Sequence, residues 1–359
     1  MTTLAQTVQA RLNNTDFRAT LGFDGFVDTI VKLVKQRVDG EATYFQTMEE
    51  WVAYQHERMG KNFSIEVENQ TMKLGGNMPI MANALSNLGC QICCIGALGF
   101  PSVHPAFQSM NETCSLLTYS NPGITQAMEF DDGKIILGEM DELNRADWSL
   151  VKNRIGLENV IDVVSQAQLL AMVNWGEINH GTTFWEGMLD DVLPACEPVN
   201  GRVLFFDLAD FSKKPAGEIL KALTLLPKFC RYGKVVLGLN QNEAKAIGKQ
   251  LVLDTDHQSM DNLIEQLYRK LEVDTLVIHH RTEAIAINRV QKDSVKSQLV
   301  ENPKLLTGAG DNFNAGFCMG TLLNLELEQC LQLAHAQSRF YIQHGFSPTI
   351  QQLIQSLNS

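Results

Sequence analysis

The chain has 359 residues, of which 45% are apolar, and this composition is sufficient to bury a large hydrophobic core. Length alone allows either one extended α/β domain or two domains. A formal net charge of −12, with no Lys/Arg block to offset it, argues against binding to nucleic acid or to an anionic membrane surface. We therefore expect a small-molecule partner.

Targeting signals and disulfides are not expected. The first residues lack the basic and apolar segments of a signal peptide, and no apolar run of about 18 residues occurs. A cytoplasmic location is therefore expected. The eight cysteines are scattered, and several lie in apolar settings, such as Cys93 and Cys94. This distribution favours reduced thiols in the core over a disulfide framework or a zinc site.

Short apolar runs alternate with longer helical patterns along the chain. Several of these runs are apolar at nearly every position, which indicates strands that are buried on both faces. The alternation predicts an α/β fold with a doubly wound, mostly parallel sheet and helices on both faces. In chain order, the predicted strands are Ala19–Phe23, Ile92–Gly96, Leu169–Val173, Val203–Asp207, Val235–Leu239 and Thr275–His279.

Two segments interrupt the alternation, and we expect them to form a small β-rich lid over the sheet edge. The first segment, 36–73, includes a predicted helix at Thr47–Arg58, and its alternative is an ordinary surface insertion. The second segment, 116–142, contains a predicted hairpin with its turn at Asp132-Gly133. The rest of the chain forms the predicted α/β core, which comprises residues 1–35, 74–115 and 143–359.

One carboxylate follows a turn of small residues at the start of an apolar helix, in the segment TGAGDNFNAGF that begins at Thr307. Gly308, Ala309 and Gly310 allow backbone N–H groups to converge on an anion, and the helix dipole adds positive potential there. Asp311 can then accept a proton from a hydroxyl that attacks phosphorus. The segment predicts the anion hole and catalytic base of a small-molecule kinase, although alone it also fits a turn with a helix N-cap.

Three motifs, in this order along the chain, resemble those of the ribokinase-like (PfkB) carbohydrate kinases. The segment 75–89, a glycine pair that opens an apolar helix ending in Leu-Gly, is similar to the N-terminal signature of that family. The segment 240–243 resembles its Asn-x-x-Glu motif, and the segment 307–317 resembles its C-terminal signature. The resemblance implies a kinase that transfers the terminal phosphoryl group of ATP to a hydroxyl of a sugar or a sugar-like molecule, with Mg²⁺.

The resemblance places the acceptor near the end of the first strand. Asp28 matches in position the aspartate that binds sugar in the family. A carboxylate suits this role, because it accepts hydrogen bonds from sugar hydroxyls. Asp24 has the same strand parity and is an additional or alternative ligand, while one of the two could merely end the strand. Gly76 and Asn77 are expected to contact the same ligand, since glycine permits a close backbone approach.

The resemblance also implies residues that bind the nucleotide and its metal. Asn240 and Glu243 are expected to act on Mg²⁺ through water, because this ion usually keeps several waters. Their alternative role is a helix cap. Thr307 and Asn314, within the C-terminal motif, and His279, at the end of the sixth predicted strand, are assigned to the nucleotide side.

Several positions depart from the family pattern. Leu305 and Leu306 replace an Asp-Thr pair, and Ile80 replaces an asparagine, which leaves the identities of donor and acceptor open. Arg281 either contacts nucleotide phosphates or faces solvent. The alternatives are therefore an ADP-dependent or nucleoside kinase of the same fold, or a non-catalytic sensor of sugars or nucleotides. A homodimer through the lid is implied by the resemblance alone.

Overall fold

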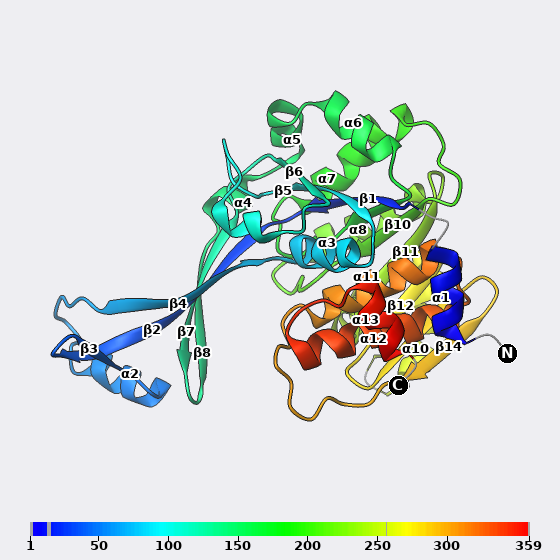
Figure 1. The fold of residues 1–359 in the computed structure, drawn as a ribbon. Coiled ribbons are helices and arrows are strands. Elements are labelled where there is room, and N and C mark those ends of the chain that lie inside the picture. The colour runs from blue at the N-terminus through cyan, green and yellow to red at the C-terminus, as the bar shows by residue number, and fades with distance from the viewer. Residues whose placement is uncertain (1–2, 13–15, 256, 358–359) are drawn as a thin grey trace.

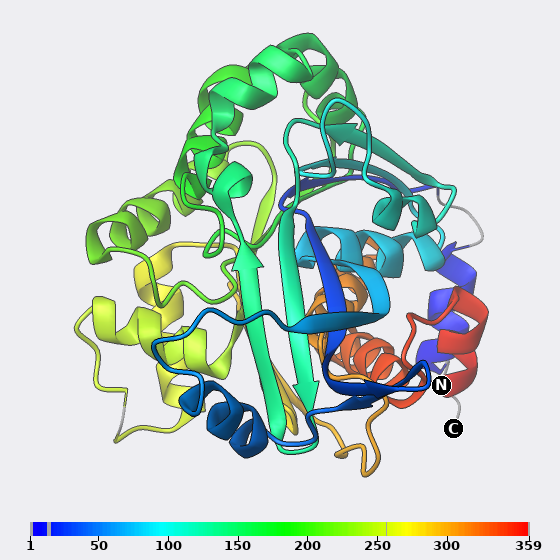
Figure 2. The same ribbon diagram turned by 90° about the vertical axis from the view of Figure 1, so that its left-hand side faces the viewer.

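Two sheets organise the chain. The structure is a computed structural model that describes residues 3–12, 16–255 and 257–357. A nine-stranded sheet has helices on both faces, and a five-stranded sheet projects from it (Figure 1 and Figure 2). This arrangement confirms the predicted α/β class, with a mostly parallel sheet and a small β-rich lid.

The large sheet contains all six predicted strands. Its strands are β1 (Arg18–Phe23), β5 (Gln91–Gly96), β6 (Cys114–Thr118), β9 (Leu169–Met172), β10 (Val203–Asp207), β11 (Lys234–Asn240), β12 (Thr275–His279), β13 (Glu283–Asn288) and β14 (Lys292–Lys296). They follow the order β14-β13-β12-β11-β10-β9-β1-β5-β6, and every pair from β12 to β6 is parallel. The edge strands β6 and β14 and the adjacent β13 were not predicted, because they are more polar than the central strands.

Helices cover both faces of this sheet and form two hydrophobic cores. They are α1 (Leu4–Leu12), α3 (Asn77–Asn87), α4 (Asp141–Arg145), α5 (Trp148–Arg154), α6 (Leu157–Ser165), α7 (Gly181–Gly187), α8 (Ala216–Phe229), α9 (Gln241–Gln250), α10 (Met260–Leu271), α11 (Ala309–Leu322), α12 (Leu327–His344) and α13 (Ile350–Ser356), with short helical turns at Pro105–Ser109, Met188–Val192 and Leu193–Ala195. The remaining helix, α2 (Met48–His56), packs in the projecting sheet. Along β10, Leu204 and Phe206 belong to the core under α5 to α10, while Val203 and Phe205 belong to the core under α1, α3, α11, α12 and α13. This alternation explains why the strand is apolar at every position.

The cysteines and the helices bear on two expectations from the sequence. All eight cysteines are free thiols in the structure, and each is buried or half-buried, as expected for thiols in the core. Across residues 3–12, 16–255 and 257–357, no helix is long and apolar enough to cross a membrane.

The projecting sheet has its own small core. Its strands are β2 (Phe26–Val38), β3 (Glu41–Tyr44), β4 (Glu66–Gly75), β7 (Gly123–Phe130) and β8 (Gly133–Glu139). The predicted helix and hairpin correspond to α2 and to β7–β8, and Trp51 of α2 packs with Phe45 and Leu33. The strand β2 enters this sheet at Phe26, earlier than the predicted lid boundary, whereas β6 pairs in the large sheet. The division of the chain into core and lid segments stays a prediction.

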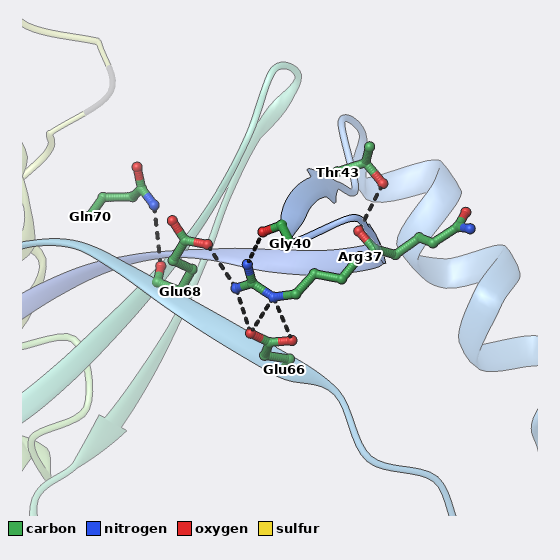
Figure 3. A network of polar contacts seen from close by, with 7 residues as sticks. Arg37, Gly40, Thr43, Glu66, Glu68 and Gln70 are labelled. Carbon is green, nitrogen blue, oxygen red and sulfur yellow. Dashed lines mark hydrogen bonds and ion pairs between the residues drawn. The ribbon is translucent and has the colours of Figure 1, made fainter.

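An ion-pair network joins β2 to β4 near the tip of the lid (Figure 3). Arg37 donates to Glu66 through Nη2 at 2.7 Å and through Nε at 3.1 Å, to Glu68 at 3.3 Å, and to the Gly40 carbonyl at 3.0 Å. These side chains are largely exposed, so the network contributes little stability.

The helices α11 and α12 approach each other more closely than ordinary side chains allow. A Cβ atom on Gly316 would lie 2.8 Å from the Cα of Ala334, and one on Gly320 would lie 3.0 Å from the Cα of Cys330. Both glycines are buried in α11. The missing side chains therefore permit near-contact between the two helix backbones, and this contact positions the start of α11 relative to α12.

This close contact generates a stability prediction. We expect Gly316→Val to lower the free energy of unfolding by about 1–3 kcal/mol, because the added methyl groups overpack the interface. Gly217→Val in α8 is the matched control, since a Cβ there meets no atom within 4 Å, and its effect should stay within about 0.5 kcal/mol. Urea unfolding of both variants measures the difference. Equal effects would show that the helix contact is not tight.

Candidate active site

The turn at 307–311 has the geometry of an anion-binding helix start. Gly308 precedes α11 in a left-handed conformation, with φ of 91°, and a Cβ there would lie 2.7 Å from the hydroxyl of Tyr341. Both constraints select glycine. Asp311 follows in the first turn of α11 and is only 8% exposed. The predicted base and turn therefore lie together at the positive end of a helix.

The three predicted N–H donors of the turn are not equivalent. The Ala309 N–H donates to the carbonyl of Leu306 at 3.1 Å and closes the turn. Within residues 3–12, 16–255 and 257–357, the Gly308 and Gly310 N–H groups have no hydrogen-bond acceptor. These two amides are therefore the ones that can bind an anion without any rearrangement.

The electrostatic surroundings make Asp311 a stronger base than an ordinary aspartate. Burial raises the pKa of Asp311 well above its ordinary value, the nearby charges of Asp207 and Asp24 raise it further, and the side chain of Asn77 acts in the opposite direction. A base whose pKa lies closer to the working pH accepts a hydroxyl proton more readily.

Two cavities flank the segment that leads into this turn. Leu305 and Thr307 line a cavity of about 410 Å³ between the lid and α3, and Leu306 and Gly310 line a second cavity of about 760 Å³ beside β12. The segment thus separates one space of sugar size from one of nucleotide size. We refer to them below as the acceptor cavity and the donor cavity.

In the acceptor cavity, the two predicted aspartates have different surroundings. Asp28 lines the cavity, and its Oδ1 accepts a 2.7 Å hydrogen bond from Thr125. Asp24 is fully buried and accepts hydrogen bonds from the N–H groups of Asn77 at 2.8 Å and Met78 at 2.9 Å, and from Asn174 at 2.6 Å. Asp24 is therefore placed to anchor the start of α3, and Asp28 to meet a ligand.

The glycine pair before α3 is explained by these same carboxylates. A Cβ on Gly75 would lie 2.4 Å from Oδ2 of Asp28, and one on Gly76 would lie 2.5 Å from Oδ2 of Asp24. Gly76 also has φ of 95°. Any larger residue would displace one of the aspartates, so the motif fixes both of them against the start of α3.

In the donor cavity, aromatic rings and the cap of α9 form the wall. The ring of His279 lies 4.8 Å from that of Phe313, and burial lowers the pKa of His279 to about 4, so the imidazole is neutral at physiological pH. Arg281 also lines this cavity. Asn240 caps α9 by accepting from the Glu243 N–H at 2.9 Å, and Glu243 accepts from the Asn240 N–H at 2.8 Å. The capping role is thus real, and it fixes Asn240 in the cavity wall with the buried Glu243 behind it.

A third buried carboxylate, Asp207, was not predicted as a site residue. It accepts hydrogen bonds from Asn314 Nδ2 at 2.6 Å and from the Ala209 N–H at 2.8 Å. Burial raises the pKa of Glu243, and the charge of Asp207 raises it further. Asn314 therefore contacts Asp207 in this structure, rather than the open cavity. The available signal was the position of Asp207 at the end of a buried strand, at the same sheet edge as Asn240.

The departures from the family pattern all lie in cavity walls. Ile80 and Leu305 line the acceptor cavity, and Leu306, which is 55% exposed, lines the donor cavity. These apolar residues narrow the set of polar contacts that each ligand can make, while the glycine turn and Asp311 are retained.

The buried Asp24 generates a pH prediction. Burial raises its pKa from 3.8 to about 6, so the folded chain keeps this proton over a pH range in which the unfolded chain has lost it. Relative to Asp24→Asn, the wild-type free energy of unfolding should fall by about 2–2.5 kcal/mol between pH 4 and pH 7, and stay level above that. Urea titrations at several pH values measure this. A difference that is independent of pH would contradict it.

Comparisons with known proteins agree with this geometry. Residues 4–359 match the family model described as prokaryotic ketohexokinase. A ketohexokinase of Haloferax volcanii is 24% identical over 340 residues, which are 94% of this chain and 89% of that protein. Arabidopsis thaliana ribokinase complexed with ribose and ATP has a TM-score of 0.66 at 14% identity and covers 96% of this chain and 100% of its own. Adenosine kinase of Sinorhizobium meliloti has a TM-score of 0.65 at 14% identity, over 96% and 99% of the two chains.

The structural similarities show the ribokinase-like fold, and the family match covers nearly the whole chain. The chain belongs to the prokaryotic ketohexokinase family, and it is a carbohydrate kinase.

Proposed function

We propose that this kinase transfers the terminal phosphoryl group of ATP to a hydroxyl of a ketohexose. The observation that carries the proposal is the position of Asp311, a buried carboxylate at the start of a helix, beside the segment that separates the acceptor and donor cavities. The ketohexose acceptor is supported by the family match and by the relative from Haloferax volcanii.

In the proposed mechanism, Asp311 accepts the proton of the sugar hydroxyl as its oxygen attacks the terminal phosphorus. The new O–P bond forms while the bond to the leaving ADP oxygen breaks, and ADP keeps that electron pair. The N–H groups of Gly308 and Gly310, together with the dipole of α11, stabilise charge on the transferring group. Ala309 contributes its N–H only if its bond to Leu306 opens.

The acceptor is bound by the lid side of the cavity. Asp28, which Thr125 and Gly75 hold in place, accepts hydrogen bonds from sugar hydroxyls. Asn77 lies between Asp24 and Asp311 and contacts the reacting hydroxyl. Closure of the lid would exclude competing water. A homodimer through this lid stays a prediction.

On the donor side, Asn240 and Glu243 would hold Mg²⁺ through its waters, and Asp207 joins them. The acidic pair of Glu243 and Asp207 fits a divalent cation, because burial and then the charge of Asp207 raise the pKa of Glu243, and a cation would offset both. In the described part of the chain, no group of three or more acidic, His or Cys side chains could hold a metal directly. When bound, Mg²⁺ neutralises charge on the phosphate oxygens. His279 lines the donor cavity on the predicted nucleotide side, whereas Thr307, also predicted for that side, lines the acceptor cavity.

The activity and its base can be tested together. With ATP and a ketohexose, Asp311→Asn should lower kcat by about 10²- to 10⁴-fold, because the amide cannot accept the hydroxyl proton. Asp162→Asn on the surface of α6 is the control and should retain full activity. A coupled assay with ketohexoses, aldohexoses, pentoses, sugar alcohols and nucleosides, each with ATP or ADP, identifies both substrates. Turnover of nucleosides alone, or with ADP alone, would overturn the proposed acceptor or donor, and binding without turnover would indicate a sensor.

The metal assignment yields a separate prediction. We expect Glu243→Gln to raise the Mg²⁺ concentration required for half-maximal activity by about 10-fold or more, because one of the two carboxylates that organise the metal waters is lost. The amide retains the size of the side chain and part of the helix cap. Initial rates over a Mg²⁺ titration at saturating ATP measure the shift. An unchanged Mg²⁺ dependence would assign Glu243 to the helix cap alone.

A further inference from the structure

Three successive carbonyl oxygens of the catalytic turn are each held by a side chain. The hydroxyl of Tyr341 donates to the carbonyl of Thr307 at 2.8 Å, and Nδ2 of Asn312 donates to that of Gly308 at 3.0 Å. The hydroxyl of Ser338 donates to the carbonyl of Ala309 at 2.9 Å. Tyr341 and Ser338 belong to α12, so a neighbouring helix supplies two of the three donors.

Holding these carbonyls also orients the N–H groups that follow them. In a planar trans peptide, the carbonyl of one residue and the N–H of the next point in opposite directions. The carbonyls of Thr307 and Ala309 point toward α12, so the N–H groups of Gly308 and Gly310 point away from it. These are the two amides without an acceptor within the described chain.

The support extends deeper into the interface between α11 and α12. Gln337, which is fully buried, donates to Oδ1 of Asn312 at 3.3 Å, so Asn312 is itself oriented from α12. The Lys304 N–H donates to the carbonyl of Ile342 at 2.9 Å and fixes the entry to the turn. Gly316 allows α12 to approach closely enough for these contacts.

The same face of α12 reaches both cavities. Tyr341 lines the acceptor cavity, while Ser338 and Ile342 line the donor cavity. Neither hydroxyl needs to contact a ligand to act, because each one is already bonded to the backbone of the turn. Their effect on phosphoryl transfer would pass through the orientation of the amides.

We propose that α12 preorganises the anion hole: Tyr341 and Ser338 are positioning residues that aim the Gly308 and Gly310 N–H groups at the transferring phosphoryl group, and Gln337 supports them through Asn312. The inference rests on the kinase function proposed above and adds to it the residues that hold the oxyanion donors. A donor contributes to catalysis only when it is already aimed at the charge that develops in the transition state.

The kinetic test uses Ser338→Ala and Tyr341→Phe, each of which removes one hydroxyl and little volume. Each should lower kcat by about 10- to 100-fold, while KM for ATP and for the sugar stays within about 2-fold, because misplaced donors weaken mainly the transition state. Ser338→Thr, which restores a hydroxyl, should recover most of the loss. Thr321→Val is the matched control, since it removes a 3.0 Å hydroxyl-to-carbonyl bond at the far end of α11.

The outcomes separate positioning from simple stability. If both variants match Thr321→Val in kcat, or if KM rises while kcat is unchanged, the positioning proposal is wrong. Wild-type protein that phosphorylates no acceptor would instead overturn the proposed function.

A second measurement decides the positioning without any turnover. Hydrogen exchange of the peptide that covers residues 304–315 should accelerate in Ser338→Ala and in Tyr341→Phe, and should remain at the wild-type rate in Thr321→Val. Unchanged exchange in that peptide would show that α12 does not hold the turn.

Discussion

The site depends on one constraint, which is the burial of negative charge at the carboxyl ends of the parallel strands. Asp24, Asp207 and Asp311 all lie there, and burial is the largest cause of the raised pKa of each. Amide groups offset part of the cost, with Asn77 placed between Asp24 and Asp311, and Asn314 bonded to Asp207. Phosphates that enter this region add further negative charge. The site therefore needs cations and helix N-termini, and α3 and α11 both begin there.

The helix α12 lies beside this cluster of buried carboxylates and contributes to the walls of both cavities. The glycines of α11 bring α12 close, and its polar side chains then hold the turn that separates acceptor from donor. The account thus requires no motion of the turn during catalysis, and it assigns movement to the lid. The lid strand β2 begins two residues after Asp24, so displacement of the lid acts directly on Asp28.

The sequence predicted the six central strands and the catalytic turn, because continuous apolar runs and glycine-rich motifs are local signals. It favoured Asp28 by position but left Asp24 as an additional or alternative ligand, since strand parity is the same for both, and the contacts of Asp24 with the start of α3 separate them. Asp207 carries no local motif. Ser338 and Tyr341 lie 29 and 34 residues from the carbonyls they hold, and a helical pattern does not reveal such tertiary contacts.

Phosphorus NMR of the wild-type protein with ATP, Mg²⁺ and a ketohexose tests the central claim most directly. The account predicts that a sugar phosphate ester and ADP form in equal amounts, with little inorganic phosphate, because Asp311 activates the sugar hydroxyl and the closed site excludes water. Release of inorganic phosphate as the main product, or ADP formation that is independent of the sugar, would contradict the account.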